Sequence, residues 1–117
     1  MRHLESSLQK DVVKYLRLEL RYIGGLIYAV PNGDKRDKII GARLKQEGVL
    51  AGVADLHILL PGGRIIFVEM KTKTGKQSEN QKIFQDTVES LGFEYLIWRS
   101  IDDAILWVKE NLRQLKR

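Results

Sequence analysis

The sequence predicts a single α/β domain that spans residues 1–117, with a central mixed sheet of about four strands flanked by helices. Three observations support this prediction. Apolar residues recur every four positions over residues 4–23, which is the spacing of an amphipathic helix. Residues 55–60 and 64–71 are two apolar segments joined by Pro-Gly-Gly, which is typical of a β-hairpin. A helical segment, a further strand and a last helical segment follow the hairpin.

The predicted elements follow one another in the order helix, strand, polar helix, strand, strand, helix, strand, helix. Gly24 and Gly92 end helices, and Ser78 and Ser100 are N-cap residues. The continuous apolar run 65–68 indicates that its strand is central and covered on both faces. The predicted ranges are 4–23, 26–30, a short helix within 34–47, 55–60, 64–71, 78–91, 94–99 and a helix that begins after Ser100.

Composition and charge narrow the class of partner. The formal net charge is +5 and the pI is about 9.6, which favours a polyanionic partner, most directly nucleic acid. The lack of cysteine excludes zinc–thiolate sites and disulfide frameworks. The N-terminus has no apolar signal-peptide region, and no apolar run approaches the roughly 20 residues of a membrane span. We therefore expect a cytoplasmic protein without a membrane partner.

Three residues at the ends of the hairpin strands have the chemistry of a metal site. Asp55 opens the first strand, and Glu69 and Lys71 close the second. Two carboxylates can bind Mg²⁺, which keeps several waters and contacts a phosphate oxygen. A lysine beside the metal can orient or deprotonate the attacking water, or neutralise the scissile phosphate. This set predicts metal-dependent hydrolysis of a phosphodiester.

Asp55 and Glu69 can bind one metal ion only if the hairpin turn has a suitable length. Residues two apart on a strand share a face, so Glu69 and Lys71 point the same way. A two-residue turn would set Asp55 opposite Met70 and turn it away from Glu69. A three-residue loop, 61–63, sets Asp55 opposite Glu69 and can hold Gly63 in the left-handed conformation. We therefore predict a loop of odd length, or a bulge with the same effect on the register.

Glu5 is the next candidate ligand. At about 100° per residue, Val12 and Leu16 lie about 20° to either side of Glu5 around the first helix. Glu5 therefore lies in line with the apolar stripe, and an inward carboxylate near a helix end needs a cation or a hydrogen-bond partner. A metal ion bound by the two strand carboxylates can be that partner. The sequence allows either one or two bound ions.

The ordered motifs resemble those of the VRR-NUC (virus-type replication-repair nuclease) family within the PD-(D/E)xK nuclease superfamily. The resemblance covers residues 5–108, and it departs from the superfamily pattern at Ala54, where proline is expected but no catalytic group is needed. The matching blocks are Glu5 with Gln9, Pro31-Asn32-Gly33, Gly48 with Gly52-Val53-x-Asp55, Val68-Glu69-x-Lys71 and Ser78-x-x-Gln81.

The resemblance implies a restriction-endonuclease-like fold and DNA cleavage dependent on Mg²⁺ or Mn²⁺. It implies a catalytic core of Asp55, Glu69 and Lys71, with Glu5 as an added acidic metal ligand and Gln81 as a supporting polar residue. Small stand-alone members look like phage-type homodimers that cut branched DNA such as four-way (Holliday) junctions. The resemblance thus implies a homodimer acting on DNA in a bacterial or phage-infected host cell.

The basic segment between the first two predicted strands is expected to contact the DNA backbone, because it lies beside the proposed site. Alternatively, this basic segment is an ordinary solvent-exposed surface that does not contact DNA. Gln81 can be a helix-cap residue instead of a site residue, Glu5 a surface carboxylate, and His57 a packed histidine instead of a ligand. The expected DNA contacts are Asn32, Lys35, Arg36, Lys38, Arg43 and Lys45.

Two other classes of function remain open. A non-catalytic DNA-binding module can retain a nuclease fold, although the acid, acid and lysine set is complete in this chain. A protein-interaction domain of a larger replication complex is the other alternative. Only direct phosphate contacts predict a steep dependence of DNA affinity on salt concentration.

Overall fold

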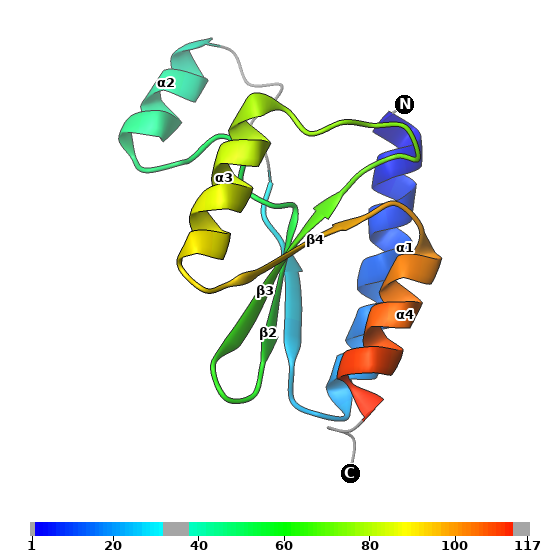
Figure 1. Cartoon of the computed structure of the whole chain (residues 1–117). Coiled ribbons are helices and arrows are strands. Elements are labelled where there is room, and N and C mark those ends of the chain that lie inside the picture. Colours follow the sequence, from blue (N-terminus) through cyan, green and yellow to red (C-terminus); the bar gives the residue numbers. More distant parts are fainter. Residues whose placement is uncertain (1, 32–37, 114–117) are drawn as a thin grey trace.

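The computed structural model describes residues 2–31 and 38–113, and their eight elements occur in the predicted order (Figure 1). Helices and strands begin and end within a few residues of the predicted bounds, as is usual for element ends. None of the described helices is long and apolar enough to cross a membrane. The elements are α1 (Arg2–Arg21), β1 (Leu26–Ala29), α2 (Lys38–Gln46), β2 (Leu56–Leu60), β3 (Arg64–Met70), α3 (Glu79–Ser90), β4 (Glu94–Trp98) and α4 (Ile101–Asn111).

The four described strands form one mixed sheet in the order β1-β2-β3-β4. β1 pairs with β2 and β2 with β3 in antiparallel fashion, whereas β3 and β4 are parallel. A parallel pair needs a long crossover connection, and α3 provides it. The prediction of a mixed four-stranded sheet flanked by helices is therefore confirmed.

The β2–β3 hairpin has the register that the proposed site demands. Leu60 pairs with Arg64 across the three-residue loop, and Leu56 pairs with Val68. Extending this register by one residue sets Asp55 opposite Glu69. Both glycines of the loop have positive φ, 86° at Gly62 and 79° at Gly63, which residues with a Cβ rarely adopt. The prediction of a three-residue turn is confirmed.

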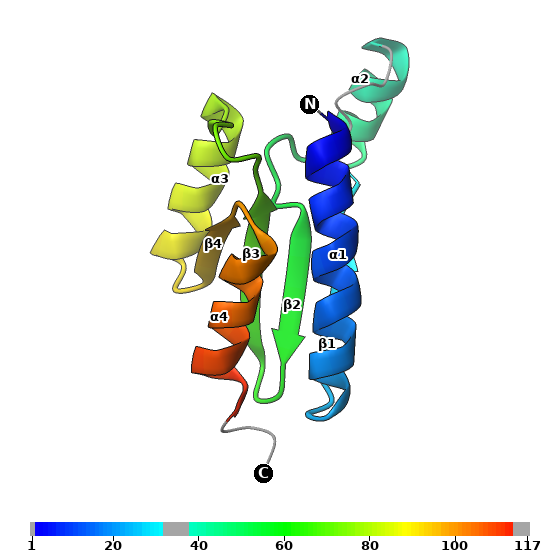
Figure 2. The same cartoon turned by 90° about the vertical axis from the view of Figure 1, so that its right-hand side faces the viewer.

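Helices cover the sheet on both faces, as Figure 2 shows with α1 and α4 on one side and α3 on the other. The larger core lies under α1 and α4 and includes the predicted stripe Val12, Leu16 and Leu20, each at most 1% exposed. The smaller core joins α3 to β4 through Val88 and Tyr95. β3 contributes to both cores, so its central position also matches the prediction.

The two predicted helix caps are present. The Ser78 side chain accepts from the Gln81 amide, and the Gln81 side chain accepts from the Ser78 amide, which completes a capping box on α3. The Ser100 side chain accepts from the Asp103 amide at the start of α4. The capping box fixes the direction in which α3 begins, and this direction brings Gln81 to the end of β3.

Candidate active site

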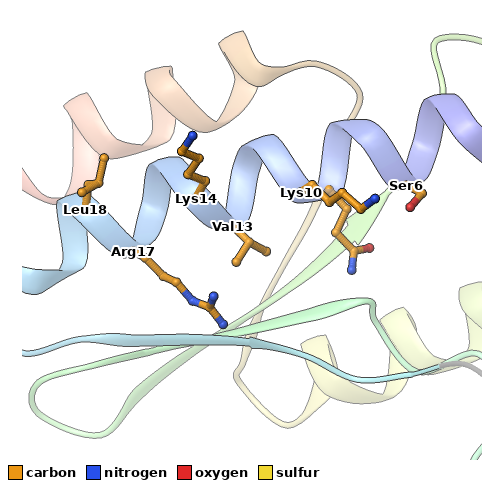
Figure 3. Close-up of a pocket in the computed structure, with 7 residues that line it drawn as sticks. Ser6, Lys10, Val13, Lys14, Arg17 and Leu18 are labelled. Atoms are coloured by element: carbon orange, nitrogen blue, oxygen red, sulfur yellow. The ribbon is translucent and has the colours of Figure 1, made fainter.

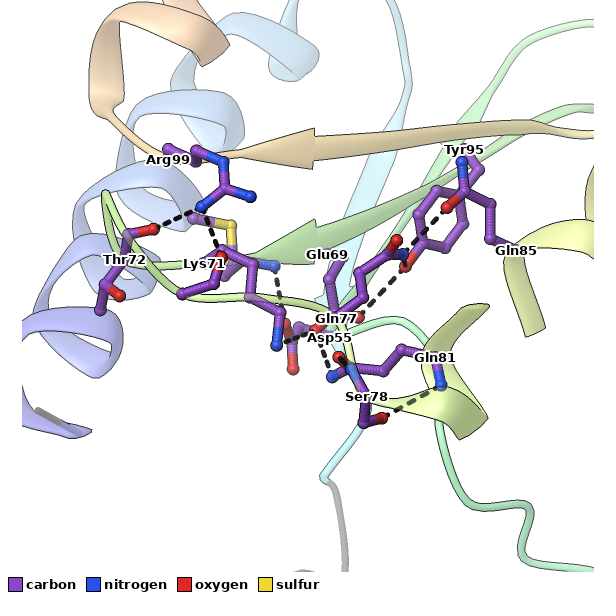
Figure 4. A network of polar contacts seen from close by, with 12 residues as sticks. Asp55, Glu69, Lys71, Thr72, Gln77, Ser78, Gln81, Gln85, Tyr95 and Arg99 are labelled. Atoms are coloured by element: carbon purple, nitrogen blue, oxygen red, sulfur yellow. Dashed lines mark hydrogen bonds and ion pairs between the residues drawn. The ribbon is translucent and has the colours of Figure 1, made fainter. Parts of the chain in front are cut away.

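Asp55 and Glu69 lie at the end of the sheet where α1 and α3 begin (Figures 1 and 4). Asp55 directly precedes β2, and its backbone carbonyl accepts from the Val30 amide at 2.8 Å. Its side-chain oxygen Oδ2 accepts from the Met70 amide at 2.7 Å. These two contacts tie Asp55 to the neighbouring strands on either side, so its carboxylate is held next to Glu69.

Glu69 is buried, with 1% of the residue exposed, and several polar side chains contact it. Its Oε2 accepts from Gln81 Nε2 at 2.7 Å and lies 3.8 Å from Lys71 Nζ. Its Oε1 accepts from the Tyr95 hydroxyl at 3.4 Å. Burial, with a further contribution from the neighbouring charge of Asp55, raises the pKa of Glu69 from 4.5 to about 8. A strongly shifted carboxyl group that faces another carboxylate and a lysine is typical of a functional site.

The surroundings of Glu5 agree with its predicted inward orientation. Glu5 is half-buried at the start of α1, and its charge also raises the pKa of Glu69. Glu5 therefore lies within electrostatic reach of Glu69. Its role as a metal ligand stays a prediction.

Lys71 directly follows β3, and its side chain is 12% exposed. Its amide donates to the Trp98 carbonyl at 3.0 Å, which continues the hydrogen bonding between β3 and β4. The loop after Lys71 is held by Arg99, whose Nη1 donates to the Thr72 and Gly75 carbonyls at 2.8 and 2.7 Å (Figure 4). Lys71 thus points at Glu69 from a backbone that is fixed on both sides.

Gln81 makes two side-chain contacts, one in the helix cap and one with Glu69. Its Oε1 accepts from the Ser78 amide at 2.8 Å as part of the capping box, while its Nε2 donates to Glu69 at 2.7 Å. One amide side chain therefore connects the N-terminus of α3 to the buried carboxylate. Because each end of the amide has a partner, the orientation of Glu69 is coupled to the position of α3.

Sequence reasoning missed Tyr95 and Gln77, which complete the polar network around Glu69. Tyr95 on β4 donates to Glu69, and Gln77 Nε2 donates to the Tyr95 hydroxyl at 3.3 Å and to Gln85 Oε1 at 2.9 Å. Burial and the negative charge of Glu69 raise the pKa of Tyr95. Tyr95 pairs with Phe67 on the neighbouring parallel strand, and Phe67 lies two residues from Glu69. Tyr95 therefore lies on the same face of the sheet as Glu69, and this alternation of faces was the signal that could have identified it.

His57 occupies the same sheet face as Asp55 and is packed among aromatic rings. Its ring makes edge-on contacts with Tyr28 and Phe67, and its Nδ1 lies 3.0 Å from the Tyr28 hydroxyl. Burial lowers the pKa of His57, which favours the neutral ring. This environment agrees with the packed-histidine interpretation.

A polar cavity of about 420 Å³ opens beside Lys71 and Gln81. Two amines and several hydrogen-bonding groups converge on it, so its chemistry suits an anionic group such as a phosphate. Its wall continues onto the capped start of α3. The lining residues are Ala51, Gly52, Lys71, Lys76, Ser78, Asn80 and Gln81.

Gly52 in the cavity wall is expected to be intolerant of a side chain. Its φ is 85°, and an added Cβ would overlap the backbone carbonyl of Asn80 at the start of α3. Gly52→Ala is therefore expected to lower the free energy of unfolding by about 1–3 kcal/mol and to displace Gln81 from Glu69. Urea denaturation measures the first effect.

Gly41→Ala in α2 is the matched control for that substitution. An added Cβ at Gly41 meets no atom within 4 Å, and alanine favours a helix by about 0.5–1 kcal/mol over glycine. Gly41→Ala should therefore leave stability unchanged or raise it. Equal stabilities of the two variants would show that the contact between Gly52 and Asn80 does not constrain the fold.

The predicted DNA-contacting segment is described only in part. Asn32, Lys35 and Arg36 lie outside the described residues, and of Lys38 only the backbone at the start of α2 is described. Arg43 and Lys45 are exposed on α2, and Arg43 lies 3.9 Å from Glu47, one helical turn away. Contact with DNA by these residues stays a prediction.

The donor set at Asp55 and Glu69 fits a hard divalent cation. Mg²⁺ is usually bound by one or two carboxylates and completes its coordination with water and substrate oxygens. The facing charge of Asp55 contributes to the raised pKa of Glu69, and a bound cation would relieve that repulsion. Within residues 2–31 and 38–113, no three His, Asp or Glu side chains are already gathered as a metal-binding cluster. Metal bound here would therefore rely chiefly on the two strand carboxylates, with water and substrate oxygens completing its coordination.

Comparisons with known proteins agree on one family. The family profile described as "VRR-NUC domain" matches residues 5–102. A solved structure called "VRR_NUC domain" is 20% identical, with a TM-score of 0.65, over 92% of this chain and 97% of that one. A second, called "VRR_NUC domain protein", is 20% identical, with a TM-score of 0.72, over 93% of this chain and 88% of that one. No curated protein gives a significant match.

Proposed function

The chain belongs to the VRR-NUC nuclease family, and from that premise and the geometry of its site we propose that it is a metal-dependent DNA endonuclease. The observation that carries the proposal is the arrangement of Asp55, Glu69 and Lys71 at one end of the sheet. Asp55 lies opposite Glu69 in the strand register, and Lys71 Nζ lies 3.8 Å from Glu69 Oε2. Two acids and an amine at this spacing suit phosphodiester hydrolysis.

Asp55 and Glu69, with Glu5 beside them, are the residues that would hold Mg²⁺ or Mn²⁺. A bound ion of this kind supplies a more acidic water and stabilises negative charge on the transferring phosphoryl group. The protein's own contribution is to hold the two carboxylates in place. Asp55 is fixed by the Met70 amide, and Glu69 by Gln81 and Tyr95.

Lys71 is proposed to act on the attacking water or on the scissile phosphate. Its amine is mostly shielded from solvent and lies between Glu69 and the polar cavity, because it contacts the first and lines the second. Lys76 and the start of α3 line the same cavity and would contact a neighbouring phosphate. The substrate backbone would therefore cross the cavity, with the cut beside Lys71.

The substrate is proposed to be DNA, with branched DNA such as a four-way junction as the preferred form. The net charge of +5 supports a polyanionic substrate. The exposed basic side chains Arg43 and Lys45 are proposed to contact the DNA backbone. A homodimer is proposed because large apolar side chains are exposed on α1, with Leu4 at 67%, and directly after it, with Tyr22 at 72%. A two-fold dimer would present two sites to two strands of a symmetric junction.

Cleavage of a panel of DNA substrates tests this proposal. Labelled duplex, flap and four-way-junction DNA would each be incubated with the protein in Mg²⁺, in Mn²⁺ and in EDTA. We expect metal-dependent cleavage, fastest on the four-way junction, and no cleavage in EDTA. Absence of cleavage of every substrate in both metals would overturn the enzymatic function. Equal rates on all substrates would overturn only the preference for branched DNA.

A further inference from the structure

One flank of α1 carries four basic side chains that no part of the site described above uses. They are spaced four, three and four residues apart, so they fall on the same side of the helix. All four are exposed. We refer to them as the basic flank: Lys10, Lys14, Arg17 and Arg21.

The charges of the basic flank have no carboxylate partner in the described part of the chain. The ion pairs found there join Arg43 to Glu47, Arg64 to Glu94 and Lys71 to Glu69. Arg64, by contrast, has a structural role, because its guanidinium donates hydrogen bonds to Glu94 at 2.6 and 2.9 Å and to Asn111 at 3.0 Å. The basic flank makes no comparable contact, so its positive potential is available to an external anion.

The surface at the basic flank is concave. A cavity of about 540 Å³ follows α1, and Figure 3 shows its basic side chains spread along the helix. It is lined by Ser6, Gln9, Lys10, Val13, Lys14, Arg17 and Leu18. The surface of this hollow is mostly apolar, and the polar ends of its basic, hydroxyl and amide side chains add several hydrogen-bond donors.

The concave surface begins beside the candidate active site. Its first lining residue, Ser6, directly follows Glu5, whose charge acts on Glu69. From there it runs along α1 away from the site toward Arg17 and Leu18. A strand that leaves the site on this side would therefore meet the basic flank.

We propose that the basic flank binds the phosphate backbone of the DNA arm that leaves the active site along α1. The proposal rests on the proposed nuclease function and adds a binding track separate from the basic α2 segment. From Lys10 to Arg21 the helix rises about 16 Å at about 1.5 Å per residue. A duplex parallel to α1 would present about five phosphates per strand over that length. Four cations at this spacing can each approach a different phosphate.

A charge-matched pair of variants tests the proposal. The first is Lys14→Gln and Arg17→Gln in one chain. The control is Lys109→Gln and Arg113→Gln, which removes the same charge from exposed positions on α4 and directly after it. Binding of a labelled duplex that extends beyond the site would be measured in EDTA over a range of salt concentrations. Thermal unfolding would show that both variants remain folded.

The plot of log affinity against log salt concentration is the decisive readout. Each lost phosphate contact lowers the slope by about 0.9, so the first variant should bind less tightly with a slope reduced by about 2. The control should keep the slope of the unmodified chain. Equal slopes for the two variants would overturn the proposal. Failure of the proposed function is distinguishable, because it appears as absent cleavage by the unmodified chain.

Directed cleavage of the DNA provides a second, geometric readout. The chain contains no cysteine, so Lys14→Cys or Lys109→Cys creates a unique attachment point for an iron chelate that generates hydroxyl radicals. The chelate at position 14 is expected to cut the DNA arm beyond the enzymatic cut, and the chelate at position 109 is not. Cuts of equal strength from both positions, or from neither, would contradict the proposed path.

Discussion

Replacing Lys71 by methionine is expected to lower the rate of DNA cleavage by about 10²- to 10⁴-fold while DNA binding is retained. Methionine keeps much of the length of the side chain but removes the charge that lies 3.8 Å from Glu69 and the amine that lines the polar cavity. Single-turnover cleavage with excess protein measures the rate. Binding of the same DNA in EDTA shows whether affinity has changed.

Lys73→Met is the matched control for this variant. Lys73 follows Lys71 by two residues, carries the same charge and is exposed. Its substitution should leave the cleavage rate within about threefold of the unmodified chain, because the Lys73 side chain is exposed and does not line the polar cavity. If Lys71→Met and Lys73→Met cleave equally fast, Lys71 has no catalytic role.

Lys71→Arg separates the two roles proposed for the lysine. Arginine keeps the positive charge but is not deprotonated in proteins, so it can neutralise a phosphate but cannot accept a proton from water. Substantial activity in Lys71→Arg would assign the residue to charge neutralisation. Loss equal to that of Lys71→Met would assign it to proton transfer or to a contact that the planar guanidinium cannot make.

The hairpin shows why part of the site was predictable from sequence. The number of residues between two antiparallel strands fixes their register, and the register fixes which side chains share a face. Counting Pro61–Gly63 as the loop therefore placed Asp55 opposite Glu69 before any coordinates were considered, and the strand pairing agrees. Helix phase placed Glu5 inward in the same way, because a helix has a fixed angle per residue.

The partners contributed by the parallel strand were not predictable in that way. β4 pairs with β3 only after the crossover through α3, and no local turn sets the register of a parallel pair. Tyr95 reaches Glu69 because Phe67 pairs with Tyr95, a relation that depends on how α3 packs. Gln77 depends in turn on Tyr95. The register between β3 and β4 could therefore not be predicted from the sequence, and neither could the contacts of Tyr95 and Gln77 that depend on it.

Gln81 illustrates a second limit. A polar residue three positions after an N-cap serine predicts a capping box, and that contact is present. The same position also suits a site residue, so the sequence leaves the two interpretations as alternatives. In the structure the two ends of one amide make the two contacts, with Oε1 on the Ser78 amide and Nε2 on Glu69, so a cap contact does not exclude a site contact. Sequence position alone does not show that α3 begins where β3 ends.

Without divalent metal, the free energy of unfolding is expected to fall as pH rises from about 5 to about 8. The pKa of Glu69 is raised from 4.5 to about 8 in the folded protein, chiefly by burial. Between those values the folded state holds a proton that the unfolded state has released, so stability is lost as pH rises. The slope approaches about 1.4 kcal/mol per pH unit for one such group. Urea denaturation in EDTA at a series of pH values measures it.

Glu69→Gln is the control, since glutamine is neutral at every pH and should remove most of this slope. Metal should reverse the trend in the unmodified chain, because a carboxylate binds a cation only after it loses its proton. Mg²⁺ should therefore stabilise the protein more at pH 8 than at pH 6, with apparent affinity rising by up to about tenfold per pH unit below the pKa. In Glu69→Gln the stabilisation by Mg²⁺ should be largely lost. An unfolding midpoint that Mg²⁺ and Mn²⁺ leave unchanged at every pH would contradict metal binding by Asp55 and Glu69.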